Sequence, residues 1–279
     1  MKAENMNFSR IDRTLPLDPA GFGIDNEFYD RLGDLWWDPQ GPMSGLHEMT
    51  PTRLKYFSRA FTRILGDEAL RSGRFIDVGC GGGILTEALA RRGYKITGLD
   101  VSEGALSAAR RHASASAVNV EYRRGSVYDL HVESATVDGV IASDLFEHLH
   151  DFPRAVSECA RVLRAGGVLA FDTVNRTWLS LFGAVWMVQK WLRLMPPHTH
   201  HWKMFITPGE LKTVFSRHGL QVAELRGISP AGHPVKLAYR LWKHRRFGRY
   251  RLSSDFRISY IGYAVKGDVP PQENSSILR

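Results

Sequence analysis

The feature that most constrains the fold of this chain is a run of glycines placed directly after a short apolar segment. Phe75–Val78 has the composition of a buried strand, Gly79–Gly83 contains four glycines, and a helical pattern begins at Ile84. Glycine lets the backbone approach a ligand closely, and doubly wound sheets bind their ligands at the carboxyl ends of the strands. The sequence therefore predicts a ligand site after this strand, with a plain tight turn as the alternative.

Short apolar runs with the character of strands alternate with helical patterns over the middle of the chain. Helical patterns lie between the first and second strands, the second and third, and the fourth and fifth. Such alternation predicts a parallel sheet covered by helices on both faces. The five predicted strands are Phe75–Val78, Lys95–Leu99, Val120–Arg123, Gly139–Ala142 and Val168–Asp172.

One domain is expected over residues 27–267, with helices before the sheet. Apolar residues recur at helical spacing from Phe28 to Trp36, and a second helical run is expected to start after a break at Pro51. The other expected segments are a flexible leader over 1–26, a helix over 208–218, strands over 220–226 and 256–265, and a disordered tail over 268–279.

The net charge of +8 comes from one segment. Between Arg226 and Ser254 there are eight Lys or Arg and no Asp or Glu, whereas the rest of the chain has 29 basic and 29 acidic residues. Such a block suggests a negatively charged partner, either nucleic-acid phosphate or the surface of an anionic membrane. A solvated basic loop is the other interpretation.

The composition indicates a globular protein in a reducing compartment. The chain is 43% hydrophobic and 24% charged, which excludes intrinsic disorder and collagen. Its two cysteines, Cys80 and Cys159, have no CxxC spacing, and Met1–Asn5 leads into no apolar export signal. We therefore expect a cytoplasmic location, with a peripheral position on the inner face of the membrane as a further expectation.

Acidic and polar residues follow the other predicted strands at the same edge of the sheet. Asp100 ends the second strand, where a carboxylate can accept hydrogen bonds from both hydroxyls of a ribose. Ser126 and Val127 follow the third strand and are candidates for contact with an adenine, and Ser143 opens the loop after the fourth. NAD enzymes also carry an acid at this place, so Asp100 by itself does not identify the cofactor.

The spacing of the glycines separates the two cofactor classes. The dinucleotide fingerprint G-x-G-x-x-G is not met, because Ile84 stands three residues after Gly81. The spacing that is met, D-x-G-x-G-x-G, resembles motif I of the class I S-adenosylmethionine-dependent methyltransferases. This resemblance implies that Asp77, Gly79, Gly81 and Gly83 bind the cofactor.

Further strings make the chain resemble the ubiquinone-biosynthesis O-methyltransferases, which methylate hydroxyls of polyprenyl catechol-type intermediates. The resemblance covers roughly residues 34–267. It implies that Arg53, Gly79, Asp100 and Ser143 bind S-adenosylmethionine, with Arg53 paired to the methionine carboxylate. The strings are Trp36-Trp37-Asp38, Leu46-His47, Pro51-Thr52-Arg53-Leu54-Lys55-Tyr56, Glu147-His148, Asn175-Arg176 and Thr199-His200.

The string Ser143–His148 contains the candidate catalytic groups. If Asp144 begins a helix, Glu147 and His148 share a face with it. In one hypothesis His148 is the general base, because its unperturbed pKa lies near working pH. In the other, Asp144, Glu147 and His148 bind Mg²⁺, as the Glu-x-x-Glu-His of similar family members implies. A capping box of Asp144 and Glu147 is the structural alternative, and His200 is a further candidate near the acceptor.

A mostly apolar segment, residues 178–195 within an insert over 177–203, raises the question of a membrane. One Gln, one Lys and one Arg interrupt it, and a spanning helix needs about 20 apolar residues, so an interfacial helix is favoured. A basic insert over 236–254, which includes an insertion relative to the family at Tyr239–Ser253, would add attraction to anionic lipid. A lid or a dimer helix buried in protein is the alternative.

The sequence thus predicts a class I methyltransferase domain: a doubly wound, mostly parallel α/β sheet with N-terminal helices and an inserted apolar helix. The expected reaction is methyl transfer from S-adenosylmethionine to a hydroxyl of a hydrophobic, aromatic acceptor. Three alternatives stay open: a natural-product methyltransferase, an RNA methyltransferase using the basic segment, and an inactive binding protein that keeps the fold. Nucleic acid is the less favoured partner, because no separate RNA-binding module is evident.

Overall fold

The structure is a computed structural model that describes residues 26–181 and 201–267. The expected leader, the expected tail, most of the apolar segment over 178–195 and the candidate His200 lie outside these residues.

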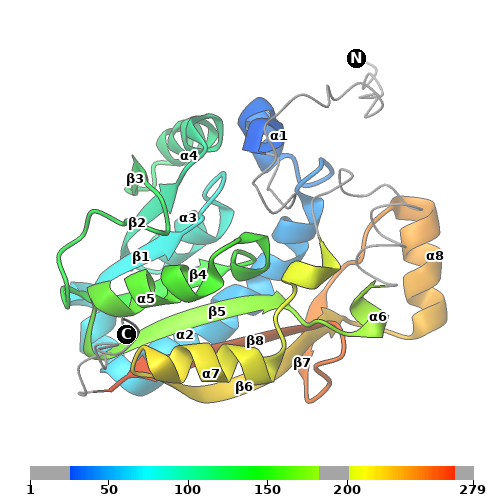
Figure 1. Cartoon of the computed structure of the whole chain (residues 1–279). Coiled ribbons are helices and arrows are strands. Elements are labelled where there is room, and N and C mark those ends of the chain that lie inside the picture. Colours follow the sequence, from blue (N-terminus) through cyan, green and yellow to red (C-terminus); the bar gives the residue numbers. More distant parts are fainter. Residues whose placement is uncertain (1–25, 182–200, 268–279) are drawn as a thin grey trace.

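One mixed sheet organises the described part of the chain, and it has eight strands in the order β3-β2-β1-β4-β5-β8-β6-β7 (Figure 1). The first five strands are parallel, and β8 runs antiparallel to β5 on one side and β6 on the other. The strands are β1 Arg74–Val78, β2 Lys95–Asp100, β3 Glu121–Arg124, β4 Val137–Ser143, β5 Leu163–Val174, β6 Leu220–Pro230, β7 Tyr250–Ser253 and β8 Ser259–Lys266.

All five predicted parallel strands are confirmed, as are the strands expected over 220–226 and 256–265. The interpretation of the basic segment as a solvated loop is wrong. There α8 (Pro234–His244) is followed by β7, which pairs with the end of β6 as an antiparallel hairpin. Sequence pattern missed both elements because cations break the apolar periodicity of this segment.

Helices cover both faces of the sheet. Phe171 of β5 packs with α5 and α7 on one face, whereas its neighbour Ala170 packs with α2 and α3 on the other, as the alternation of a strand requires. The helices are α1 Asn26–Arg31, α2 Ser44–Ser72, α3 Ile84–Ala90, α4 Glu103–Ala115, α5 Phe152–Val162, α6 Trp178–Ser180, α7 Pro208–Arg217 and α8, with short 3-10 turns η2 Gly33–Trp37, η3 Phe146–His148 and η5 Trp202–Met204.

The expected helix break at Pro51 is wrong. Helix α2 continues through Pro51, and its non-helical residue is Gly66, with φ of +78°. A proline inside a helix costs about 3 kcal/mol. The fully buried side chains that α2 contributes to the core, Phe57 and Phe61 among them, offset this cost, since each is worth about 1.5–3 kcal/mol.

Among the described residues, none of the helices has the length and apolar character that crossing a bilayer requires.

Candidate active site

The glycine-rich loop is fixed to the end of β2 by backbone hydrogen bonds. The amides of Gly79 and Cys80 both donate to the carbonyl of Leu99, at 2.8 and 3.0 Å. The amide of Gly81 donates to Asp100 Oδ2 at 2.8 Å, and that of Ser102 donates to Oδ1 at 2.9 Å. Burial raises the pKa of Asp100, and these amide bonds oppose the shift. Asp100 therefore lies at the glycine loop, as predicted, and it also organises the loop.

Aromatic side chains from the N-terminal region cover the glycine loop. Gly81 has a φ of +53°, and a Cβ there would lie 2.5 Å from the ring of Trp36. The next indole, that of Trp37, donates to the carbonyl of Gly82 at 2.9 Å. A side chain at position 81 would thus collide with Trp36. Glycine is needed there so that the indole can pack against the loop, in addition to its predicted role of letting a ligand approach the backbone closely.

Asp77 is buried below the loop. Its Oδ2 accepts a 2.6 Å hydrogen bond from the hydroxyl of Thr86, which ties α3 to β1. Burial raises the pKa of Asp77 from 3.8 to about 7, with the Thr86 bond opposing the shift. The geometry makes Asp77 a support of the loop.

A buried ion pair joins α2 to the end of β5. Arg53, which is 3% exposed, donates from Nε and Nη2 to Asp172 Oδ2 at 3.1 and 2.6 Å. Ser143 donates to Asp172 Oδ1 at 2.5 Å from the neighbouring strand β4. Burial lowers the pKa of Arg53, but the charges of Asp172 and Asp144 outweigh it and raise the pKa.

Asp172 is the site residue that the sequence analysis missed. It ends the fifth predicted strand, at the same edge as Asp100 and Ser143. The signal was therefore present, but nothing in the sequence showed that its partner would be Arg53, 119 residues earlier.

The turn after β4 differs from the expected helix. Asp144 has a φ of +54° and η3 begins only at Phe146, so Asp144 and Glu147 form no capping box. The carboxylate of Glu147 is buried and faces β5, where it accepts from Thr173 Oγ1 at 2.8 Å and from the Val174 amide at 3.2 Å. Burial raises the pKa of Glu147 well above its ordinary value, and the charge of Asp144 adds to the shift.

As arranged, Asp144, Glu147 and His148 do not fit a metal site. Over 26–181 and 201–267, no three His, Cys, Asp or Glu side chains are grouped so that they could hold a metal ion. The predicted ligand Glu147 instead uses its oxygens within the fold, on Thr173 and Val174.

The remaining predicted residues lie on connections at the same edge. His148 is half-buried on η3, with its amide bonded to the carbonyl of Leu145 at 2.9 Å. The β3–β4 connection is held to β2 because the amide of Gly125 donates to the Asp100 carbonyl at 2.9 Å. Ser126 accepts from the Tyr128 amide at 3.2 Å, and Val127 packs against the main core. Adenine contact by these two residues stays a prediction.

Comparison with known proteins assigns the chain to a family. Residues 76–171 match the family model described as "Methyltransferase domain". The chain is 38% identical over 236 residues to the ubiquinone biosynthesis O-methyltransferase of Xanthomonas euvesicatoria, covering 84% of this chain and 90% of that protein. It is 35% identical over 239 residues to the enzyme of the same name from Hahella chejuensis, covering 85% and 92%. The chain belongs to the ubiquinone biosynthesis O-methyltransferase family.

Solved structures show the same fold. The magnesium protoporphyrin IX methyltransferase of Synechocystis PCC 6803 with bound S-adenosylmethionine has a TM-score of 0.56 at 16% identity, covering 87% of this chain and 95% of that one. A second structure of that enzyme, with bound S-adenosylhomocysteine, has a TM-score of 0.52 at 18% identity, covering 77% and 83%. The predicted class I fold is confirmed, and the protein is a methyltransferase that uses S-adenosylmethionine.

The charges of the site fit the cofactor of this O-methyltransferase. Asp100, Asp144 and Asp172 lie at the carboxyl edge of the parallel strands, and Arg53 is the cation paired among them. The cofactor brings a sulfonium and an ammonium group, so an acidic excess is electrostatically favourable. The pairing of Arg53 with the methionine carboxylate stays a prediction. In the structure, the Nε and Nη2 groups of Arg53 both donate to Asp172.

Proposed function

We propose that this O-methyltransferase methylates a hydroxyl of a hydrophobic, aromatic acceptor of the catechol or quinol type. The observation that carries the proposal is the identity of 38% across 84% of the chain with an enzyme named for ubiquinone biosynthesis. The acid-rich edge around the glycine loop supports it, because it suits a cationic methyl donor. Oxygen is the atom methylated in this family, and the catechol or quinol class is the proposed refinement.

In this reaction the protein has to align the acceptor oxygen with the methyl group and to remove the proton of the acceptor hydroxyl. The sulfonium of the bound cofactor supplies an already activated methyl group. Alignment of the acceptor oxygen with that group contributes on the order of 7–11 kcal/mol in well-oriented systems. His148 is the proposed base, since it lies on η3 directly beyond the end of β4 and takes the hydroxyl proton as the O–CH₃ bond forms and the S–CH₃ bond breaks. Arg53 and Asp172 keep α2 and β5 fixed beside it.

The direct test is transfer of a labelled methyl group from S-adenosylmethionine to defined acceptors. A prenylated catechol should give a monomethylated product, identified by mass spectrometry, whereas the same molecule with both hydroxyls methylated should give none. Transfer to bulk tRNA with none to catechols would contradict the proposal and favour the RNA alternative. Binding of the cofactor without turnover on any catechol or quinol would contradict it as well.

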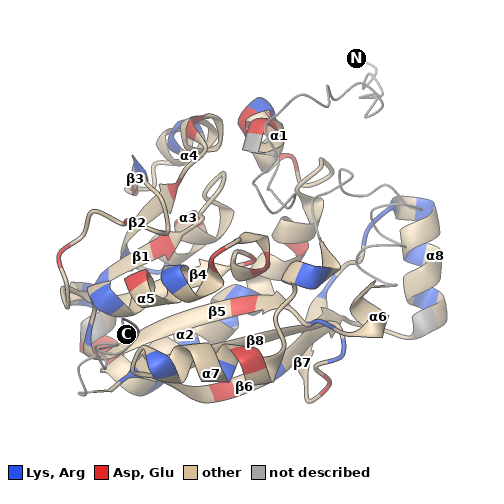
Figure 2. Cartoon of the chain, in the orientation of Figure 1, with Lys and Arg blue, Asp and Glu red and all other residues tan. Residues whose placement is uncertain are grey.

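We also propose that α8 rests on an anionic membrane surface, from which a hydrophobic acceptor would be taken. Val235, Tyr239 and Trp242 recur at i, i+4 and i+7, and they are 70, 51 and 78% exposed. Lys236 and Lys243 flank this face, and Figure 2 shows basic but no acidic residues on α8. An apolar face bordered by cations suits the boundary between headgroups and acyl chains.

Membrane contact was expected at residues 178–195, of which only the first four are described. Among these, Trp178 and Leu179 are 77 and 43% exposed. The described residues therefore support the membrane proposal mainly through α8, an element that the sequence did not predict.

A further inference from the structure

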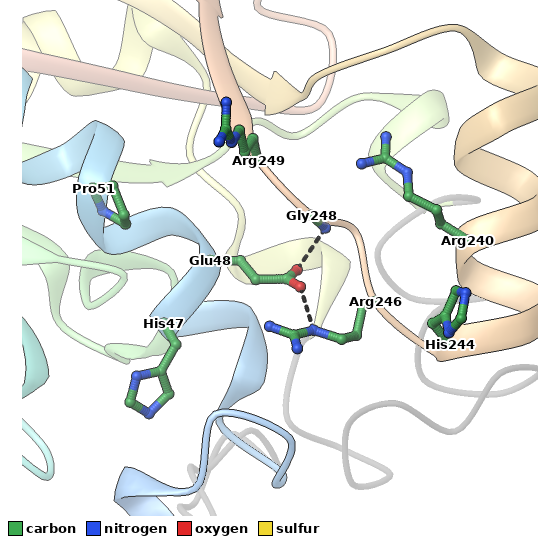
Figure 3. Close-up of a pocket in the computed structure, with 8 residues that line it drawn as sticks. All are labelled: His47, Glu48, Pro51, Arg240, His244, Arg246, Gly248 and Arg249. Atoms are coloured by element: carbon green, nitrogen blue, oxygen red, sulfur yellow. Dashed lines mark hydrogen bonds and ion pairs between the residues drawn. The ribbon is translucent and has the colours of Figure 1, made fainter.

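A pocket of about 380 Å³ lies between the beginning of α2 and the segment from α8 to β7 (Figure 3). The cofactor loop contributes none of its lining. The residues that line it are His47, Glu48, Pro51, Arg240, His244, Arg246, Gly248 and Arg249.

The acidic residue of this lining is already neutralised. Glu48, whose side chain is 6% exposed, accepts from Arg246 Nε at 2.7 Å. It also accepts from the amides of Phe247 and Gly248, at 3.0 and 2.9 Å. Figure 3 shows its carboxylate pointing at the loop between α8 and β7. Glu48 thus fixes the loop and leaves no negative charge for the other cations of the pocket.

Arg240 is held in place and pairs with no acidic residue in the described part of the chain. Its Nη2 donates to the carbonyl of Ala231 at 2.6 Å. Its guanidinium also lies against Gly248, which has a φ of +82° and where a Cβ would be 2.3 Å from Nη1. Glycine is required at this position both for the positive φ and for the approach of Arg240. The result is a fixed cation at the pocket wall.

Arg249, directly before β7, forms no ion pair with any residue described in the structure. It is exposed and lines the same pocket as Arg240, and the two guanidinium groups flank Gly248 in Figure 3. Two cations in one concave site that pair with no carboxylate over residues 26–181 and 201–267 make up the pattern that a carboxylate or phosphate group satisfies.

The segment that lines the pocket contacts α2 beside Arg53. Tyr250 follows Arg249, and its carbonyl accepts a hydrogen bond from Thr52 Oγ1 at 3.1 Å. Burial raises the pKa of Tyr250, and the charges of Glu48, Arg53 and Asp144 all act on it. The Tyr250 hydroxyl is therefore within electrostatic reach of both the pocket and the Arg53–Asp144 pair. A molecule that extends along Tyr250 would reach from one to the other.

We propose that this pocket binds a carboxylate or phosphate group carried by the methyl acceptor. The inference rests on the proposed function, which it makes more specific. The acidic edge would hold the cationic methyl donor and the basic pocket the anionic end of the acceptor, so the two substrates are sorted by charge. Five of the lining residues belong to the segment Tyr239–Ser253, which the sequence predicts to be an insertion relative to the family.

The test compares a carboxylated with a neutral catechol in calorimetry on the full chain loaded with S-adenosylhomocysteine. We expect 3,4-dihydroxybenzoate to bind at least about tenfold more tightly than catechol. Arg249→Gln should remove most of this difference. The matched control is Arg251→Gln, which removes the same charge from an exposed site in β7, two residues after Arg249, and should keep the difference. Equal affinities for the two catechols, or equal losses in both variants, would overturn the proposal.

Two further measurements separate the sources of the anion. Inorganic phosphate should compete with 3,4-dihydroxybenzoate in the parent protein and much less in Arg249→Gln. Competition by phosphatidylglycerol vesicles, with none by phosphate, would assign the pocket to a lipid headgroup and overturn the assignment to the acceptor. Methyl transfer at equal efficiency to both catechols would agree with the proposed function and would contradict binding of an anionic group of the acceptor in the pocket. Tight binding of the carboxylated catechol with no transfer would support the pocket and refute the function.

Discussion

Arg53 of α2 and Asp172 of β5 form a buried ion pair in which one carboxylate oxygen accepts from both Nε and Nη2, at 3.1 and 2.6 Å. Each residue is at most 3% exposed. The pair joins α2, which precedes the sheet, to β5 in the middle of the sheet.

Removing Asp172 should be strongly destabilising. In Asp172→Ala the Arg53 charge would stay buried without its bonded partner, and loss of one member of a buried pair costs about 3–5 kcal/mol. Urea unfolding followed by circular dichroism measures this loss. The control is Glu121→Ala, which breaks the exposed pair with Arg123 and should cost about 1 kcal/mol or less. Similar small losses in both variants would show that the buried pair contributes no more to the free energy of unfolding than the exposed pair does.

The stability of the protein should depend on the protonation of Asp77. Its pKa is about 7 in the fold and 3.8 ordinarily, so between these values the folded state holds a proton that the unfolded state has released. The contribution of Asp77 to stability is therefore full at low pH, falls as pH rises from about 4 to 7, and is constant above. Asp77→Asn, which can still accept from Thr86, removes this dependence.

The measurement for Asp77 is the difference in unfolding free energy between Asp77→Asn and the parent protein across pH. The variant should gain stability relative to the parent between about pH 5 and 7, and the difference should then level off. A difference that does not change with pH, or that changes in the opposite direction, would refute the raised pKa.

Asp100→Ala should weaken cofactor binding at least about tenfold, because the variant loses the predicted ribose acceptor and the acceptor of the Gly81 and Ser102 amides. Calorimetry with S-adenosylmethionine gives the dissociation constant. Glu103→Ala is the matched control, since Glu103 is an exposed acid on the first turn of the following helix α4. Unchanged affinity in Asp100→Ala would remove this residue from the cofactor site.

His148→Ala should lower turnover at least about tenfold while cofactor affinity is kept, because the variant removes the proposed base and no cofactor contact. The dependence of kcat on pH is the decisive readout. If His148 is the base, the rise of kcat with pH that reflects its deprotonation must be absent from the variant. His150→Ala, at an exposed site two residues further on, should keep the parent profile. Near-normal turnover in His148→Ala would reject His148 as the base.

Replacing Trp242 should weaken attachment to anionic vesicles. Trp242 is 78% exposed on α8, and burial of such a side chain is worth about 1.5–3 kcal/mol. Sedimentation with phosphatidylglycerol vesicles should show roughly tenfold weaker binding for Trp242→Ser. Val101→Ser removes an apolar side chain that is 44% exposed on the β2–α4 connection and should bind like the parent. Equal binding of both variants would place the membrane contact elsewhere.

Local pattern was enough to predict much of this protein. The five parallel strands, the glycine turn and the position of Asp100 all follow from short-range rules: alternation along a strand, helical periodicity and the freedom of glycine at positive φ. These features recur in the structure because each depends on residues close together in the chain.

Tertiary structure decided what local pattern could not. Pro51 remains inside α2 because packing of the helix against the sheet outweighs the missing hydrogen bond. Glu147 turns into the core because Asp144 adopts a left-handed conformation and η3 starts late. Arg53 meets Asp172, and Glu48 meets the loop after α8, across 119 and about 200 residues of chain. Such pairs depend on which strands and helices become neighbours, and the free energy that selects those neighbours is that of the whole core.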